Sequence, residues 1–121
     1  MNYDKAYDLA AAMRESEEYK ELMAAQAEVE KDEVSAQLVR TFMAQQMEWE
    51  YAKLAQAPNE AELLKKQEAL MPEIEANPLV SKYVQAHMRW SQVSNDIYKI
   101  ISGPITEGMK VLEHESKDKQ H

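Results

Sequence analysis

The 121-residue chain contains no cysteine, only two glycines and four prolines, and no long apolar run. The absence of cysteine excludes disulfides, cysteine-ligated zinc or iron–sulfur sites and thiol catalysis. Two glycines are too few for a glycine-rich loop that could cradle a phosphate. No apolar run approaches the ~20 residues of a membrane span, and the opening residues lack the pattern of a signal peptide. We therefore expect a cytoplasmic protein.

Basic residues are also scarce. The chain has 14 Lys and Arg against 22 Asp and Glu, a formal net charge of −8. A surface with this balance repels the phosphate backbone of nucleic acids. Direct binding would need the basic residues to gather on one face, which Lys82, Arg89 and Lys99 could do in part. A nucleic-acid-associated regulator is therefore one alternative, and the net charge argues against it.

The chain is rich in Ala, Glu, Lys, Gln, Leu and Met, the side chains that lose least freedom in a helix. The longest predicted helix spans 77–103 and would be ~39 Å long. Asn77 is a good N-cap, Pro78 suits the first helical position, and Gly103-Pro104 is expected to end the helix. An apolar seam with spacings of four and three runs along it: Leu79, Tyr83, Ala86, Trp90, Val93, Ile97 and Ile100.

Three helices are predicted in the first half of the chain. The first spans 2–15, and Ser16 is expected to break it and cap the second. Asp32 is a plausible cap for a long third helix, 33–56, whose length of about 36 Å matches that of the 77–103 helix. These two long helices are expected to form the antiparallel backbone of the bundle.

Ala57-Pro58-Asn59 is the clearest linker, and Asn59 with Glu62 resembles a capping box for a fourth helix. Pro72 lies inside that helix and predicts a kink or a short gap, since an interior proline costs about 3 kcal/mol. The predicted fold is all-α, an elongated antiparallel bundle of four to five helices. Residues 1–112 would form a single helical domain and 113–121 a mobile polar tail.

No catalytic or cofactor motif is present. The chain lacks the Glu-x-x-His of di-iron bundles, the His-Glu-x-x-His of zinc proteases and the nucleophile and dinucleotide fingerprints. We predict no catalytic residue, no cofactor and no metal site. One alternative is a metal-binding or metal-dependent enzyme using bundle carboxylates and His87, which needs two acids within ligand reach of a common point. The other histidines, His114 and His121, lie in the polar tail.

Methionine is frequent, with eight residues including the first. Most of these side chains fall on or beside apolar stripes, either as core filler or as an adaptable surface for a partner. A bundle of this size cannot cover two broad apolar faces, so a strip left over on the 33–56 helix would be a natural dimer face. The candidate interaction surface comprises Met43, Met47, Trp49, Met88 and Trp90.

The opening YDKAYDLAAAMRESEEYKELMAA and the later SNDIYKIISGPITEGMKVL resemble the YlbF/YmcA/YheA family of small helical proteins from Gram-positive bacteria. The resemblance covers most of residues 2–112 and is greatest for the YheA-like branch. It implies an all-helical cytoplasmic dimer without known catalytic residues. The resembling positions are Tyr3-Asp4, Ala6, Leu9, Ser16, Glu18-Tyr19, Asp96-Ile97, Lys99-Ile100-Ile101 and Pro104.

Some members of that family regulate competence, sporulation and biofilm formation, as partners of related small helical proteins and of the RNA-decay endonuclease RNase Y. The same branches include members whose cysteines can hold an iron–sulfur cluster. This chain has no cysteine, so cluster binding is not implied for it. The lack of a catalytic constellation, the surplus of apolar helix face and the resemblance together predict a non-enzymatic, adaptor-like interaction or regulatory protein. The resemblance transfers no functional residue, because the matching positions look structural.

Overall fold

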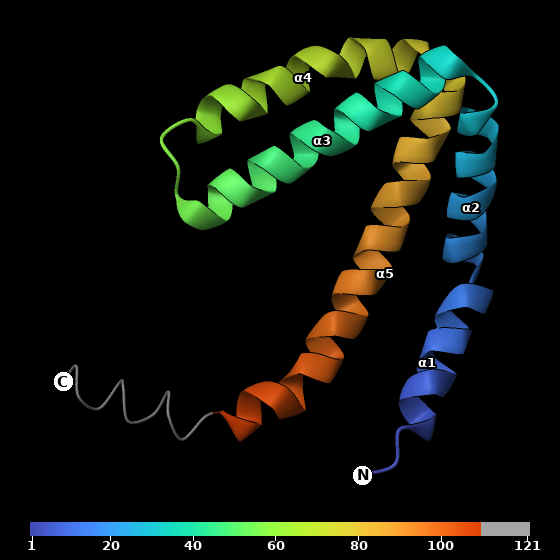
Figure 1. Cartoon of the computed structure of the whole chain (residues 1–121), viewed down its shortest axis with the longest axis vertical. Coiled ribbons are helices and arrows are strands. Elements are labelled where there is room, and N and C mark those ends of the chain that lie inside the picture. Colours follow the sequence, from blue (N-terminus) through green and yellow to red (C-terminus); the bar gives the residue numbers. More distant parts are fainter. Residues whose placement is uncertain (110–121) are drawn as a thin grey trace.

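The computed structural model describes residues 1–109, and within them it contains five α-helices and no strand (Figure 1). The predicted all-α fold is therefore confirmed. The tail predicted for 113–121 lies outside the described residues. The helices are α1 (Asp4–Glu15), α2 (Glu17–Glu30), α3 (Glu33–Ala55), α4 (Glu60–Ala76) and α5 (Pro78–Gly108).

Side-chain caps begin three of the helices where the sequence predicts. The Ser16 hydroxyl accepts a hydrogen bond from the Tyr19 backbone N–H at 3.3 Å, so α1 and α2 are separate helices. The Asp32 carboxylate begins α3 in the same way. The Asn77 amide oxygen accepts from two backbone N–H groups of α5, at 3.1 and 3.2 Å. Each cap satisfies N–H groups that have no partner within the helix.

The capping box predicted for α4 is wrong. Asn59 has φ −92° and ψ 11°, not the extended conformation of a side-chain cap, and it makes no side-chain cap hydrogen bond. The preceding turn is set by the end of α3 instead. Gln56 is left-handed, with φ 52°, and the Ala57 N–H donates back to the Ala52 carbonyl at 2.8 Å. This is the Schellman arrangement of a helix C-terminus.

Two prolines lie inside continuous helices. Helix α4 runs through Pro72 without a gap, and α5 runs through Pro104 to Gly108. The expectation that Gly103-Pro104 ends the last long helix is therefore wrong. A glycine ends a helix when it turns left-handed, and Gly103 keeps a negative φ. Pro104 removes one hydrogen bond and favours a bend, and the last turns of α5 curve in Figure 1.

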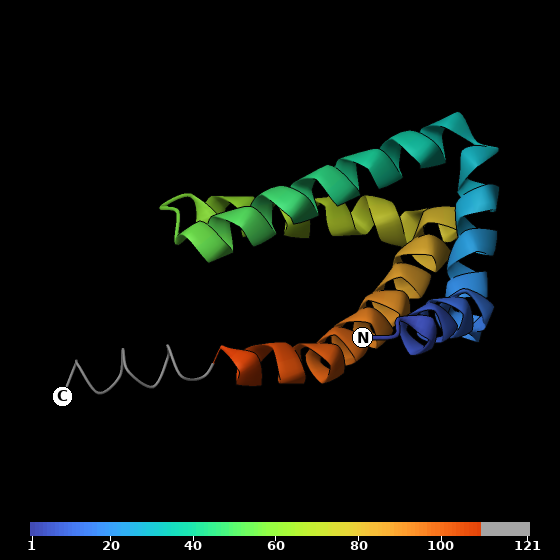
Figure 2. The same cartoon turned by 60° about the horizontal axis from the view of Figure 1, so that its bottom comes forward.

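The helices form two arms that diverge from one corner (Figures 1 and 2). One arm is the α3–α4 hairpin, and in the other α5 packs mainly along α2, which continues into α1. The expected antiparallel backbone of the two long helices is therefore wrong, because α3 and α5 contact each other only near the corner and then separate. Both helices begin at this corner after short connections, and short connections place consecutive helices side by side.

The buried core is concentrated where the arms meet. Beyond the corner each arm is only two helices thick, and α1 contributes no buried residue. Helices this thinly covered can bury one face each, so other apolar faces stay open. The core cluster comprises Leu22, Ala25, Val29, Ala36, Phe42, Leu70, Ile74, Val80, Tyr83, Val84 and Ala86.

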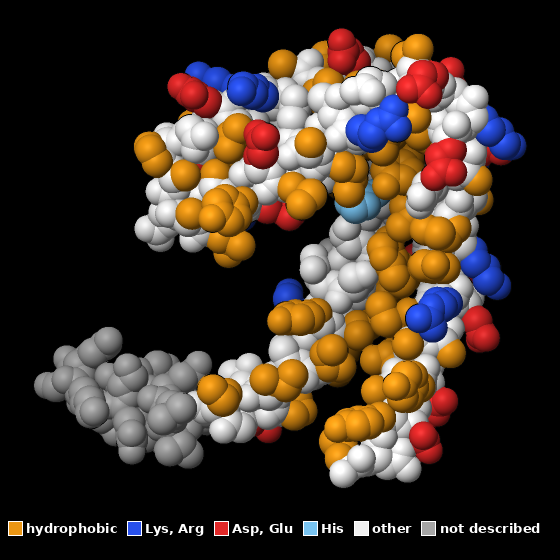
Figure 3. Space-filling model, in the orientation of Figure 1, with side chains coloured by type: hydrophobic (Ala, Val, Ile, Leu, Met, Phe, Trp, Pro, Cys, Tyr) orange, Lys and Arg blue, Asp and Glu red, His pale blue; other side chains and the backbone are white. Residues whose placement is uncertain are grey.

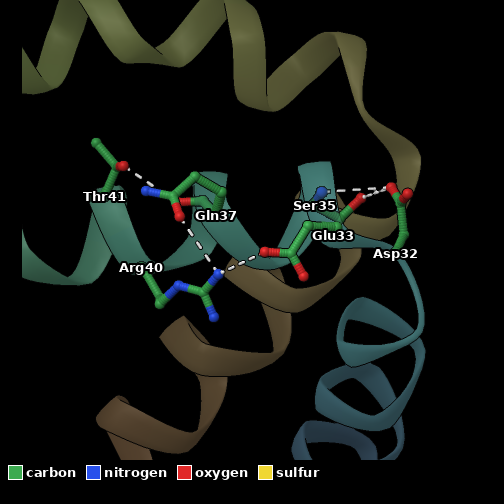
Figure 4. Close-up of polar contacts among 6 residues, drawn as sticks. All are labelled: Asp32, Glu33, Ser35, Gln37, Arg40 and Thr41. Atoms are coloured by element: carbon green, nitrogen blue, oxygen red, sulfur yellow. Dashed lines mark hydrogen bonds and ion pairs between the residues drawn. The ribbon is translucent and has the colours of Figure 1, made fainter.

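A hydrogen-bonded chain of three polar side chains joins the two helix starts at the corner. Asn77 donates from its amide nitrogen to the Ser35 hydroxyl at 3.0 Å, and Ser35 donates to the Asp32 carboxylate at 2.5 Å. Ser35 is completely buried. Figure 4 shows Asp32 and Ser35 together and, one turn further along α3, Arg40 contacting Glu33 and Gln37. The N-caps of α3 and α5 are thereby fixed to each other.

Candidate interaction surface

One concave feature is a cleft of about 590 Å³ in the angle where α3 and α5 diverge, and a larger groove of about 680 Å³, lined partly by Val34, lies between α3 and α4. Met43 and Met47 line the cleft from α3, and Met88 and Trp90 line it from α5. Four of the five residues predicted as an interaction surface thus converge on one cleft. Met47 and Met88 are 68% and 62% exposed, so the thioethers face open space and do not fill the core.

Trp90 and Trp49 occupy different surroundings. Trp90 is half-buried and meets the Tyr19 ring edge-to-face at 5.3 Å, which ties α5 to α2. Trp49 does not line the cleft. It lies under the ammonium group of Lys53, 5.1 Å from the ring centroid, and its indole nitrogen is buried without a hydrogen-bond partner among the described residues. The structure therefore separates Trp49 from the other four candidate residues.

His87 lies in the same cleft and stacks on the Tyr83 ring, with centroids 6.1 Å apart. Burial lowers the pKa of His87 below its ordinary value, and the nearby Glu50 carboxylate partly opposes this shift. Burial also raises the pKa of the Tyr83 hydroxyl. Within residues 1–109 no three His, Asp or Glu side chains are grouped to hold a metal ion, so His87 lacks there the carboxylates that the metal-enzyme alternative needs.

Regular lines of side chains extend the cleft along both helices. On α3 the line continues from Met43 and Met47 at helical spacing through Glu50 to Leu54, with Tyr51 beside it. We call Met43, Met47, Glu50 and Leu54 the α3 inner line. On α5, residues at intervals of four and seven form the α5 inner line: His87, Ser91, Tyr98, Ile105 and Met109. Figure 3 shows hydrophobic side chains along both inner edges and the hollow between them.

Sequence reasoning missed the outer half of the α5 inner line. Tyr98, Ile105 and Met109 are 68%, 66% and 54% exposed. They were overlooked because the apolar seam of α5 that packs on α2 dominates the pattern, and Ser91 interrupts the second line. The signal was nevertheless present, since intervals of four and seven keep residues on one face of a helix.

The basic residues of α5 do not form a free cluster. The Arg89 guanidinium donates to the Glu21 carboxylate of α2 at 3.0 Å, so this arginine links two helices. Lys82 lies on the same side of α5 as Arg89, and Lys99 is turned away by helical spacing. This arrangement does not favour the nucleic-acid alternative.

Comparison with known proteins agrees with the fold and the sequence pattern. Residues 2–106 match the family model described as "Control of competence regulator ComK, YlbF/YmcA". The chain belongs to the YlbF/YmcA family. The resemblance seen in the sequence is thereby confirmed.

Relatives of this YlbF/YmcA-family chain include UPF0342 proteins of two bacteria. The protein of Caldicellulosiruptor bescii is 35% identical over 103 residues, covering 85% of this chain and 87% of that protein. The protein of Streptococcus equi subsp. zooepidemicus is 35% identical over 106 residues, covering 87% and 93%.

A solved structure shares the fold of this family member. It is a chain of the crystal structure of Bacillus subtilis RicA in complex with RicF, with a TM-score of 0.52 and 18% sequence identity. The match covers 88% of this chain and 94% of that one. Among the described residues of the present YlbF/YmcA-family chain, no helix is long and apolar enough to cross a membrane.

This family member exposes more surface than a compact monomer. Its accessible surface is 9577 Å², whereas a compact monomer of its 14.0 kDa exposes about 6700 Å². The difference is about 2900 Å², and twelve wholly unfolded residues, the number outside the described range, would expose only about 2000 Å². The open angle between the arms therefore leaves a surplus of uncovered surface.

Proposed function

We propose that this chain is a non-enzymatic interaction protein of the cytoplasm that acts as a homodimer and regulates other proteins by binding them. The observation that carries the proposal is the open cleft between α3 and α5, where Met47 and Met88 are largely exposed. Contiguous exposed apolar surface marks sites of protein association. Flexible thioethers suit contacts with more than one partner.

The family supports a regulatory role for these contacts. Its model is described by control of a competence regulator, and a chain of the same fold comes from the structure of RicA in complex with RicF. We propose that the partners of the present chain include related small helical proteins and RNase Y, as its resemblance to the family implies. The chain would then act in competence, sporulation, biofilm or RNA-decay control.

Partner capture in living cells tests this proposal. The tagged full-length protein would be crosslinked in its host and recovered, and its partners identified by mass spectrometry. Recovery of RNase Y or of related helical proteins is the expected result. Met88→Glu, which changes the cleft outside the two inner lines, should lose these partners, and Val34→Glu, which is similarly exposed on another face, should retain them.

Recovery of other partners, or of none, would contradict parts of this proposal. If only the protein itself were recovered, the adaptor role would be contradicted and a self-associating bundle would remain. Light scattering of the purified protein measures the dimer separately. A monomer at tens of micromolar, whose association is unchanged by substitutions in the cleft, would contradict the homodimer.

A further inference from the structure

We infer that two copies interlock through their open angles, so that the α3–α4 arm of each copy lies between the two arms of the other. The α3 inner line of one copy then contacts the α5 inner line of its partner, twice over, about a two-fold axis. This inference rests on the proposed homodimer and specifies its surface. Such an isologous interface uses the same patch on both copies.

The shape of the single chain explains why the two lines need a partner. They begin together at the cleft, and they separate as the arms diverge (Figures 1 and 2). The buried core and the Asn77–Ser35–Asp32 hydrogen bonds hold the corner, and the two lines stay apart within the single chain. Exposure rises away from the corner along α3, from the half-buried Met43 to 68% at Met47 and 87% at Leu54.

The chemistry of the two lines suits burial against each other. Leu54 and Tyr51 at the end of α3 and Tyr98 and Ile105 on α5 are 66% to 87% exposed, and Tyr98 also lines the groove between α5 and α1. Aromatic and aliphatic side chains of this size form the buried centres of protein interfaces.

The charges of α5 lie away from its inner line, which carries no Lys, Arg, Asp or Glu side chain. Residues 33–76 carry four basic and eight acidic side chains, a balance of −4. Helix α5 carries three basic and two acidic side chains, a balance of +1, and it is the one helix of the described chain with a basic surplus. Arg89 is paired with Glu21, and Lys82 lies on the same side of α5, opposite the inner line by helical spacing, so the α3 inner line of a second copy meets an uncharged face.

The uncovered area is sufficient for a stable dimer. The surplus over a compact monomer is about 2900 Å², and about 900 Å² remains after twelve unfolded residues are allowed for. A stable interface needs about 800 Å² from each partner. The surplus surface of the whole chain therefore matches this requirement.

Sedimentation equilibrium of the full chain and four variants tests the inference. Leu54→Glu and Tyr98→Glu place a charge on the inner lines and should raise the dimer dissociation constant at least about tenfold, as expected for the centre of an interface. Val34→Glu and Ile100→Glu are matched controls, 72% and 73% exposed. Each lies on the opposite side of its helix by helical spacing and should change the constant less than about threefold.

The outcomes separate this inference from the proposed function. A monomeric wild type would overturn both the homodimer and its interface. A wild-type dimer unaffected by both inner substitutions would overturn the interlocked arrangement and leave the homodimer standing. Dissociation by the control substitutions to the same extent would also overturn it. Circular dichroism would verify that each variant is folded, which exposed positions allow.

Crosslinking provides a second measurement, since the chain has no cysteine of its own. Leu54→Cys and Tyr98→Cys proteins would be purified separately, mixed and treated with a bifunctional maleimide. The interlocked dimer predicts more mixed crosslinked species than Leu54→Cys forms with Ile100→Cys. Equal yields from the two mixtures would contradict contact between the inner lines.

Discussion

At the scale of single residues, Asn77 connects the two arms of the molecule. Its amide oxygen caps α5 and its amide nitrogen reaches Ser35, which in turn binds the Asp32 cap of α3. Both N-caps therefore depend on one chain of hydrogen bonds. The angle between the arms is held by polar side chains as well as by the apolar core beneath them.

Removing Ser35, the middle group of these hydrogen bonds, should destabilise the folded protein. Ser35→Ala leaves the Asn77 amide nitrogen without its acceptor at a corner where Ser35 is fully buried, which should lower the free energy of unfolding by about 1–3 kcal/mol. Urea denaturation monitored by circular dichroism measures the change. Ser102→Ala is the control, because its hydroxyl only donates to the Lys99 carbonyl on the same helix. Equal losses in both variants would contradict the role of Ser35.

His87 should make stability depend on pH. Its pKa is lowered mainly by burial, with Glu50 opposing, so the folded chain binds fewer protons than the unfolded chain below pH 6.5. The stability contributed by neutral His87 is present above that pH and is lost as pH falls through the lower pKa of the folded state. His87→Gln removes this dependence. Thermal unfolding at pH values from about 8 to about 5 should show the wild type losing more stability than the variant.

At the scale of elements, the starts of α2, α3 and α5 were predictable because their capping signals are local, whereas the cap of α4 and the end of α5 were not. Ser16, Asp32 and Asn77 each act within three residues of their own position, and all three cap as expected. The pairing of the long helices was not predictable in this way. The apolar stripes of α3 and α5 are equally compatible with several neighbours, and the corner at Asn77 that sets them apart depends on contacts distant in sequence.

The candidate interaction surface was likewise predictable only in part. Met43, Met47, Met88 and Trp90 could be selected by spacing, and the structure places them around one cleft. Trp49 has the same helical context but packs with Lys53 on another face. The sequence did not indicate Tyr98 and Ile105 as candidate interaction residues, because what distinguishes them is their exposure. That exposure results from the divergence of the two arms, which the sequence pattern does not show.

The interior prolines give a prediction at the element scale. Pro72 denies the Glu68 carbonyl its helical donor, although α4 is continuous on both sides. Pro72→Ala should therefore raise the free energy of unfolding, by about 1–3 kcal/mol. Pro78→Ala is the control, since the first position of α5 needs no N–H donor and should gain nothing. Denaturant titration compares the two, and a gain in the control alone would contradict this account.

At the scale of the whole molecule, the two-armed shape links folding to association. The buried cluster lies at the corner, and the arms beyond it are two helices thick with exposed inner lines. A second copy that covers these lines would bind the folded chain and not the unfolded one. Stability should then depend on protein concentration, because mass action favours the folded dimer.

Thermal unfolding at several concentrations tests this link. The midpoint of the wild type should rise by a few degrees across a hundredfold increase in concentration, since each tenfold step adds about 1.4 kcal/mol to dimer formation. Leu54→Glu should unfold at a midpoint nearly independent of concentration, because Leu54 is 87% exposed and contributes to association but little to the core. If the unfolding midpoint of the wild type did not change with concentration, each arm would be stable without a second copy. The exposed inner lines would then not be explained by dimer formation.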